Sequence, residues 1–410
     1  MNTYEQNVVD ALSPLRDESP APPRIDLAGV MAEGRRRRRS VRLATAGGTL
    51  AAVAVVAVLV PLGVAAVRGT GPSTHPAGTA AGPSARAVAP TSLTCTEQLL
   101  PVPDGVTKAL VYGGDPTGKY LVGRSYPQRT GFHEQPLLWF DGVAHKIAIP
   151  GDDPTIGAVT SNGKAIGSSF NGDVESGYFV SDGKVTRLAG PKGSTATDLN
   201  SAGVIVGGRF GANGVSVPIM WKTPTSEPTD LRMPGPNWVG SATAINDDGT
   251  IVGDVSTSTH TLLSRTIVWQ PDGSFQLIPL PTLAGVSGIN SLSSFNLRGN
   301  VLIGEAAVVT SQETAFYPLA YDLGTGKFTD LQHANLWVTG GNSQHWLAGE
   351  GIHNRPAIWT SGTGLVLLPT LTSKPDTGDE ASFISEDGTI VAGQNTDKHG
   401  VIRAVEWRCH

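Results

Sequence analysis

The sequence predicts an all-β fold, a seven-bladed β-propeller closed by an N-terminal strand in its last blade and preceded by one transmembrane helix. Three observations carry this prediction. A turn motif ending in glycine recurs seven times between residues 111 and 393, an aromatic residue follows each copy, and a 25-residue stretch without charge precedes the repeats. A chain of 410 residues is long for one domain unless the fold is such a ring or a barrel.

The turn motif ends in a glycine that recurs about every 40 to 50 residues. Its clearest copies read "ATDLNSAGVIVG" (196–207), "ATAINDDGTIVG" (242–253) and "ASFISEDGTIVAG" (381–393). A period of this length is typical of propellers and other repeat arrays. The seven closing glycines are Gly123, Gly167, Gly207, Gly253, Gly304, Gly349 and Gly393.

A second landmark is an aromatic residue at the end of an apolar run, about 10 to 17 residues after each closing glycine. Each unit offers four short runs separated by Gly, Asp, Asn or Pro, which is the pattern of strands joined by turns. Four antiparallel strands about every 45 residues form one propeller blade. The aromatic residues are Trp139, Phe179, Trp221, Trp269, Tyr321, Trp359 and Trp407.

The stretch "GGDPTGKY" (113–120) comes within one residue of a phosphate-binding loop. Such a loop must open a helix, whose N-terminus supplies a positive dipole, but here the chain enters the apolar run "YLVG". Tyr120 also stands where a magnesium-binding hydroxyl would be needed. The stretch aligns with "INDDGT" (245–250), so we predict a hairpin turn between the first two strands of a blade, with Gly118 at positive φ.

The pattern A-h-N-x-x-G-x-h-V-G, followed by h-W and x-x-L (h, apolar), resembles the extracellular HAF-repeat family and, more loosely, WD40-like bacterial propeller repeats. The resemblance covers residues 111–410, with "RTIVW" and "RPAIW" standing where the family has His-Ala-Phe. It implies an exported, propeller-like fold and supplies no catalytic residues. The Ala, Val, Gly and Arg bias resembles actinobacterial proteins, here with a single-pass N-terminal anchor.

Cys95 and Cys409, the only cysteines, lie near the two ends of the repeat region. The seventh unit stops after its third strand, and "SLTCTEQLLPVP" (92–103) resembles a fourth strand. We therefore predict that the N-terminal strand completes the last blade and that the cysteines form a disulfide between adjacent strands. The alternative is two unpaired buried thiols.

The uncharged segment predicts the division of the chain into domains. Residues 43–67 are long enough to cross a hydrocarbon core of about 30 Å as a helix. Arginines cluster on its N-terminal side, which places residues 1–42 in the cytoplasm and the rest outside. Residues 68–92 read as a flexible linker, and residues 93–410 as the extracellular propeller. A cleaved signal peptide is the alternative, although its charged leader would be unusually long.

Charge narrows the class of partner. The formal net charge of the chain is −5, and residues 1–92 hold ten arginines against six acidic residues. The remainder is therefore acidic, which is unfavourable for nucleic acid binding. The expected partners are membrane lipid, an extracellular ligand or protein, and a cytosolic partner of residues 1–34.

The candidate binding residues follow the closing glycines, where second-to-third strand connections should gather around the channel. Loops on a rigid scaffold often carry function, and these form a mixed-charge rim. The alternative is ordinary solvated loop residues. No catalytic residue, metal site or cofactor is predicted; "HWLAGEGIH" (345–353) brings two histidines and Glu350 together only in sequence. The candidates are Arg124, Arg129, His133, Asp254, His260, Glu305 and Glu350.

These features favour a membrane-anchored, non-enzymatic propeller that acts as a binding, sensing or scaffold module. One alternative is a transmembrane regulator, similar to some anti-sigma factors, that signals through residues 1–34. Another is an exported hydrolase or lyase acting on polysaccharide, which would need two carboxylates suitably spaced at the channel mouth.

Overall fold

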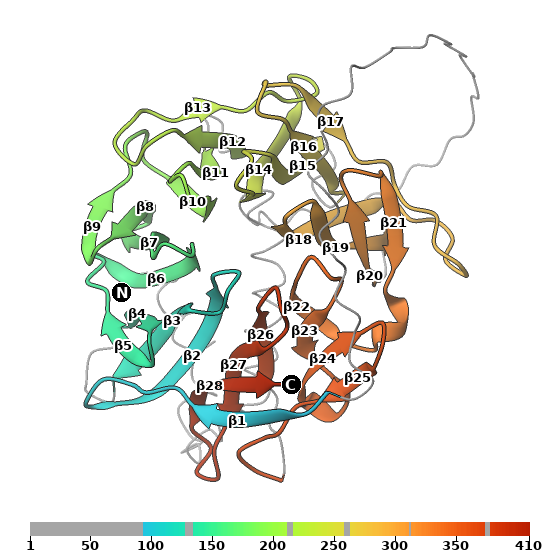
Figure 1. Ribbon diagram of the computed structural model, residues 1–410. Coiled ribbons are helices and arrows are strands. Elements are labelled where there is room, and N and C mark those ends of the chain that lie inside the picture. Colours follow the sequence, from blue (N-terminus) through green and yellow to red (C-terminus); the bar gives the residue numbers. More distant parts are fainter. Residues whose placement is uncertain (1–92, 128–133, 211–215, 258–262, 311–312, 374–377) are drawn as a thin grey trace, which may run out of the picture. The chain divides into compact units, whose positions relative to one another are not determined.

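The computed structural model describes residues 93–410 except 128–133, 211–215, 258–262, 311–312 and 374–377. Within that part of the chain, the strands β1 to β28 form seven four-stranded antiparallel sheets, so the all-β, seven-bladed propeller is confirmed (Figure 1). No helix among the described residues is long and apolar enough to cross a membrane. The predicted tail, membrane segment and linker (1–42, 43–67 and 68–92) lie outside the described residues.

The first three blades each consist of four consecutive strands that pair in chain order. Blade 1 contains β2 (Val106–Gly114), β3 (Tyr120–Pro127), β4 (Gln135–Phe140) and β5 (Val143–Lys146). Blade 2 contains β6 (Asp152–Val159), β7 (Ala165–Asn171), β8 (Val174–Ser181) and β9 (Lys184–Arg187). Blade 3 contains β10 (Ser194–Leu199), β11 (Ile205–Phe210), β12 (Ser216–Trp221) and β13 (Thr229–Asp230).

The next three blades follow the same order. Blade 4 contains β14 (Trp238–Ile245), β15 (Ile251–Thr257), β16 (Arg265–Trp269) and β17 (Phe275–Leu277). Blade 5 contains β18 (Ser291–Arg298), β19 (Val301–Val309), β20 (Thr314–Asp322) and β21 (Lys327–Asp330). Blade 6 contains β22 (Trp337–Gly341), β23 (Leu347–Glu350), β24 (Pro356–Thr360) and β25 (Gly364–Leu367). Two short 3₁₀ helices, η2 (Gln332–Ala334) and η3 (Ile352–Asn354), lie in connections.

Blade 7 joins the two ends of the described chain. It contains β26 (Glu380–Ile384), β27 (Ile390–Thr396) and β28 (Ile402–Cys409), and its outer strand is β1 (Cys95–Leu99). β1 pairs antiparallel with β28, and the two strands lie side by side in Figure 1. The predicted closure of the ring by an N-terminal strand is therefore confirmed.

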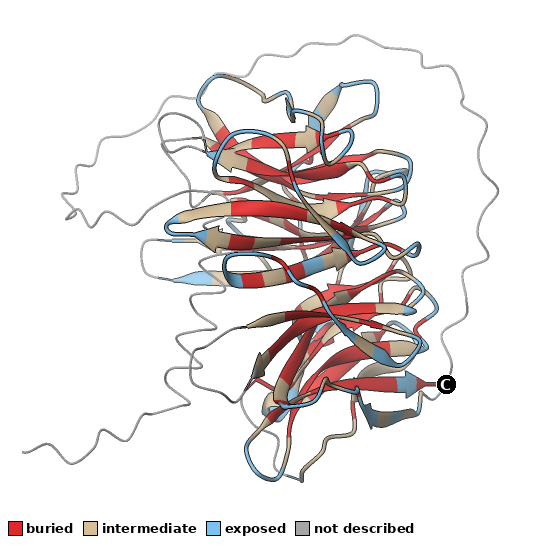
Figure 2. Ribbon diagram, turned by 90° about the vertical axis from the view of Figure 1, so that its left-hand side faces the viewer, coloured by how far each residue is buried: buried red, intermediate tan, exposed pale blue. Residues whose placement is uncertain are grey.

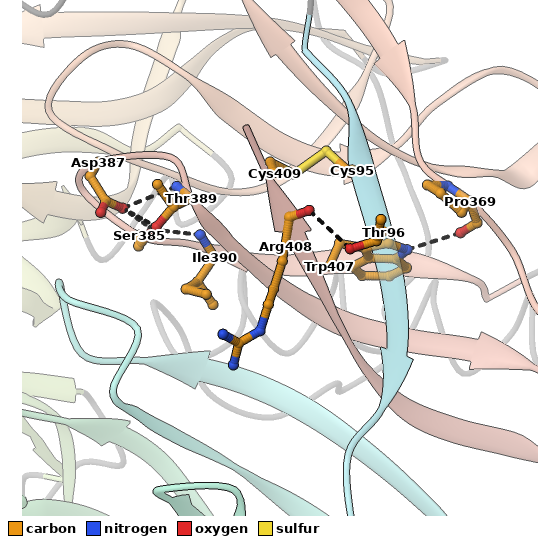
Figure 3. Close-up of a disulfide and its surroundings, with 10 residues drawn as sticks. All are labelled: Cys95, Thr96, Pro369, Ser385, Asp387, Thr389, Ile390, Trp407, Arg408 and Cys409. Carbon is orange, nitrogen blue, oxygen red and sulfur yellow. Dashed lines mark hydrogen bonds between the residues drawn. A yellow bond between two sulfur atoms is a disulfide. The ribbon is translucent and has the colours of Figure 1, made fainter.

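The closing pair of strands is also covalently linked. Cys95 lies directly opposite Cys409 in the register, with their Cα atoms 4.0 Å apart, and the two form a disulfide across 314 residues (Figure 3). In the chain-entropy model, a disulfide that closes a loop of this size stabilises the folded state by about 5 kcal/mol, because it restricts the unfolded chain. The predicted disulfide is therefore present, and the alternative of two free thiols was wrong.

The hydrophobic core is divided among the interfaces between blades. Seven clusters of buried residues each combine side chains from two neighbouring blades, including blades 7 and 1. Figure 2 shows buried residues along the strands and exposed ones mainly in turns and connections. Because every blade depends on both neighbours for its core, the ring is stabilised by being complete.

Third-strand tryptophans tie blades 1, 3, 4 and 7 to the connection that precedes each of them. Trp139, Trp221, Trp269 and Trp407 are at most 2% exposed, and burying an aromatic side chain stabilises a fold by about 1.5–3 kcal/mol. Their indole N–H groups donate to backbone carbonyls 2.6–2.9 Å away. The acceptors, in the same order, are Pro101, Ala189, Arg232 and Pro369.

The closing glycines have a common structural cause. In every described blade, the first strand has a β-bulge, and the closing glycine pairs with the residue just before the bulged one. A Cβ on any of the seven would lie 1.9–2.3 Å from a carbonyl oxygen of that first strand. Only glycine lets the two backbones approach this closely.

The bulged residue serves a second purpose in three blades, where it is threonine. Thr197 Oγ1 lies 2.8 Å from the Ala242 carbonyl oxygen of the next blade, and Thr243 Oγ1 lies 2.8 Å from Ser294 Oγ. Thr339 similarly donates to the Ala381 carbonyl. Each of these hydroxyls also lies 3.1–3.2 Å from a carbonyl oxygen of the second strand of its own blade, so the bulged threonine links two neighbouring sheets.

The stretch "GGDPTGKY" forms the predicted turn between β2 and β3. Asp115 accepts hydrogen bonds from the backbone N–H groups of Thr117 and Tyr120, and Gly118 has a φ of 73°. In other blades an asparagine takes the place of Asp115. Asn200 and Asn246 each accept an N–H within their own turn and donate to a carbonyl in the next blade's turn. The N-x-x-G part of the repeat is thus explained by contacts between turns.

We expect Gly207→Ala to destabilise the protein by about 2–3 kcal/mol, because its Cβ would lie 2.0 Å from the Thr195 carbonyl oxygen. The matched control is Gly157→Ala, at a bulge where a Cβ meets nothing within 4 Å. The control should change stability by less than about 0.5 kcal/mol. Chemical denaturation of the full-length chain measures both. Equal losses in the two variants would contradict the close-approach explanation.

We expect the double variant Cys95→Ser/Cys409→Ser to lose about 2–5 kcal/mol of unfolding free energy, because the ends of the ring are no longer linked. Adding reductant should weaken the native protein to a similar degree and leave the double variant unaffected. Native protein that is unfolded without reductant should show no alkylatable thiol; two reactive thiols in that material would rule out the bridge.

Candidate functional site

The four predicted rim residues that the structure describes lie in strands, so the prediction that connections begin at these positions was wrong. Arg124, Asp254 and Glu305 lie inside β3, β15 and β19, and Glu350 is the last residue of β23. All four directly follow a closing glycine on the second strand of their blade. The equivalent residues of the other blades are Ser168, Gly208 and Gln394.

Asp254 is a buried connector between blades 4 and 5. Its carboxylate accepts the backbone N–H of Ser294 at 3.0 Å, the Ser294 hydroxyl at 3.0 Å and the Thr266 hydroxyl at 3.3 Å. Burial raises the pKa of Asp254 to about 7, and the hydrogen bonds from Ser294 and Thr266 only partly oppose this effect. The geometry assigns Asp254 a role in holding two blades together.

Arg124 makes an equivalent connection between blades 1 and 2. Its guanidinium is 2.7 Å from the Glu134 carboxylate and also pairs with Asp153, the second residue of β6. It also lies over the Tyr126 ring, at 5.1 Å from the centroid. Its Nε atom is buried and has no hydrogen-bond partner among the described residues.

The other members of this ring of positions differ in chemistry. Gln394 donates to the Gly378 carbonyl at 2.6 Å, and a Cβ at Gly208 would meet Ser241 of the next blade at 3.2 Å. Glu305 and Glu350 are half-buried at equivalent positions of adjacent blades 5 and 6. Several of these positions therefore face a neighbouring blade or connection, and ligand binding by Arg124, Asp254, Glu305 and Glu350 stays a prediction.

The remaining three residues of the predicted rim, Arg129, His133 and His260, lie outside the described residues. His345 belongs to the turn before β23, whereas His353 lies in the connection after it, so the two stand at opposite ends of that strand. Within the described chain, no group of three or more His, Cys, Asp or Glu residues is placed to hold a metal ion.

Arg298 was missed by the sequence reasoning and spans the centre of the ring. It extends from the end of β18 in blade 5 to the Gly114 carbonyl of blade 1, at 3.4 Å, although blades 6 and 7 separate these two along the ring. Burial raises the pKa of Asp198 in blade 3 to about 6, and the charge of Arg298 limits the rise. The only sequence signal was "NLRGN", where arginine replaces the turn asparagine of the repeat.

Glu97 is a second missed residue, on the closing strand itself. Its carboxylate accepts a hydrogen bond from Asn395 at 2.7 Å, and Asn395 is fully buried. Burial raises the pKa of Glu97 to about 7, against the effect of the Asn395 bond, and the nearby Asp379 carboxylate adds to the rise. A single sequence offers no signal for this contact because the two residues lie 298 positions apart.

A groove of about 250 Å³ lies beside the ring closure, and we name it the seam groove. It is bounded by the end of β1 and by β28 on one side, and by the β2–β3 and β4–β5 turns of blade 1 on the other. Its lining includes Gln98, Leu99, Leu100, Lys119, Leu121, Trp139, Phe140, Glu406 and Arg408.

The fold and the closure together define the protein as a seven-bladed β-propeller whose ends are joined by a strand and a disulfide. No family model matches the chain, and no curated protein matches it. Similar solved structures include the β-propeller domain of the Trilobed protease from Pyrococcus furiosus, described as having an open velcro topology. That domain has 9% identity and a TM-score of 0.49, over 73% of this chain and 95% of its own.

Two further solved structures are peptidases. A Mycobacterium tuberculosis puromycin-hydrolyzing peptidase has 12% identity and a TM-score of 0.40, over 63% of this chain and 43% of its own. A prolyl endopeptidase has 12% identity and a TM-score of 0.47, over 74% of this chain and 50% of its own. The chain thus spans about half or less of the length of each peptidase.

We expect Asp254→Asn to flatten the pH dependence of stability. The folded-state pKa of about 7 lies above the unfolded value, so the contribution of Asp254 is complete below about pH 4 and is lost as pH rises through 7. Relative to the variant, the native protein should lose roughly 1–4 kcal/mol between pH 5 and pH 8. Denaturation of the full-length chain across this range measures the difference, and parallel curves would contradict it.

Proposed function

We propose that the protein is a membrane-anchored propeller that acts outside the cell as a binding module. The observation that carries this proposal is the Cys95–Cys409 disulfide at the closure of the ring. Disulfides persist in oxidising compartments and are rare in the cytosol. A domain that relies on such a bond at its closure is suited to the outer side of a membrane.

The order of segments along the chain supports the same arrangement. Residues 43–67 carry no charge, and the arginines at 35–39 and 42 precede them. Under the positive-inside rule, this asymmetry keeps the N-terminus in the cytoplasm and sends the propeller across. The linker 68–92 then joins the anchor to the closing strand, which begins at Cys95.

The construction of the ring supports a binding role. Ion pairs of Arg124 and hydrogen bonds of Asp254 fix neighbouring blades, and the Trp indoles fix four of the blades to a connection. A scaffold fixed in this way holds its connections and grooves in constant positions, which favours recognition because little order must be created on binding. We therefore assign ligand recognition to the connections and grooves that this scaffold holds in place.

The test is the sidedness of single cysteines in intact cells, because both native cysteines are already bonded. Ser73→Cys lies in the predicted linker and Ser19→Cys in the predicted cytoplasmic tail. A membrane-impermeant maleimide should label Ser73→Cys in intact cells and Ser19→Cys only after lysis. The chain should also remain with the membrane after alkaline extraction. Labelling of both sites before lysis, or release of the chain, would contradict the anchor.

A further inference from the structure

The seam groove presents two cationic side chains beside an exposed leucine of the same strand pair. Leu99 of β1 is 56% exposed, and its side chain lies on the face of the β1–β28 pair opposite that of Gln98, Glu406 and Arg408, whereas Leu121 and Trp139 in the groove are each 2% exposed. Lys119 is exposed in the β2–β3 turn, on the blade 1 side. Arg408 of β28 stands on the blade 7 side, and its side chain is 63% exposed.

The one carboxylate in the groove is already compensated. Glu406 has a side chain only 9% exposed, and it accepts hydrogen bonds from Gln98 Nε2 and Arg408 Nε, both at 2.8 Å. The Arg408 side chain extends from β28 away from the disulfide (Figure 3). With its Nε bound to Glu406, the terminal amino groups of the guanidinium remain to bind a second anion.

The aromatic residues of the groove do not present a broad open face. Trp139 is buried, and the Phe140 ring is stacked on Tyr120 with centroids 4.5 Å apart. The Lys119 ammonium lies 4.7 Å from the Phe140 centroid. Since flat rings and sugars are best received by exposed aromatic faces, the groove is poorly suited to such ligands.

The neighbouring strand edge favours an extended ligand. Among the described strands, β1 is the outer strand of blade 7 and pairs with β28 alone. The backbone N–H groups of Thr94 and Leu100 donate to carbonyls of His410 and Ala404. In an antiparallel ladder every second residue bonds the same neighbour, so the backbone N–H and C=O of Leu99 point to the free edge of β1. An extended peptide can add to such an edge, and its side chains then alternate between the groove face, which carries Arg408, and the opposite face, which carries Leu99.

We propose that the seam groove binds an extended segment of a partner protein that carries acidic side chains alternating with aliphatic ones. The acidic side chain pairs with Arg408 and Lys119, and the aliphatic one packs on Leu99. This inference rests on the proposed function in taking the propeller as a binding module. Its test uses purified protein, so its outcome is independent of the topology experiment.

The probe is a blocked, fluorescent hexapeptide of alternating leucine and glutamate, titrated against the full-length chain in detergent. We expect saturable binding that weakens with added salt, because the cations are exposed. Arg408→Gln and Lys119→Gln should each weaken binding about threefold to tenfold, since a tenfold change corresponds to about 1.4 kcal/mol. Lys184→Gln, an exposed lysine of β9 in blade 2, is the matched control and should bind as the native chain does.

Arg408→Gln also removes the ion pair with Glu406, so Leu99→Glu provides a further variant that leaves this pair in place. Because Leu99 is exposed, the change should leave thermal stability intact while abolishing binding, since a charged group replaces the apolar contact with the leucine of the peptide. Several outcomes would overturn the proposal: no binding of the probe at millimolar concentration, equal binding of a leucine–lysine hexapeptide, unchanged affinity in all three groove variants, or binding of an oligouronate in place of the peptide.

Discussion

The pairing of β1 with β28 is the contact on which the rest of the structure depends. Each interface between blades holds part of the hydrophobic core, so a gap at one position would expose apolar surface on both neighbours. Blade 7 supplies only three strands from its own part of the chain. The N-terminal strand β1 completes the blade, and the Cys95–Cys409 disulfide prevents β1 from separating from β28. Closure thus joins seven sheets, none of which has a complete core of its own, into one cooperative unit.

Within that ring, the closing glycines show how one steric constraint produces a repeated sequence motif. The bulge in each first strand brings a carbonyl oxygen against the second strand, where a side chain cannot fit. In return, the bulge directs hydroxyls such as those of Thr197 and Thr339 to the next blade. The motif therefore records how blades are joined and carries no information about a ligand. Residues that recognise a partner must be sought where the blades differ.

The sequence was sufficient for the blade number, the closure and the disulfide because each leaves a local, repeated or countable signal. It misplaced Arg124, Asp254 and Glu305, because nothing near the closing glycine marks how far a second strand continues before its connection. It also missed Arg298 and Glu97, whose partners Gly114 and Asn395 lie far away in sequence. Contacts of this kind depend on the curvature of the ring, which no single repeat encodes. The seam groove escaped for the same reason, since its two walls come from opposite ends of the domain.

The position of the disulfide has a mechanical consequence. Any force that reaches the propeller through the N-terminal part of the chain enters at Cys95, the first residue of β1. An edge strand pulled from its end would normally unzip one ladder hydrogen bond at a time. Here the load passes at once through a covalent bond into Cys409 at the end of β28, which is held by β27 on its far side. The four residues of β1 beyond the bridge therefore bear no tension, and the ring can transmit a pulling force without separation of β1 from β28.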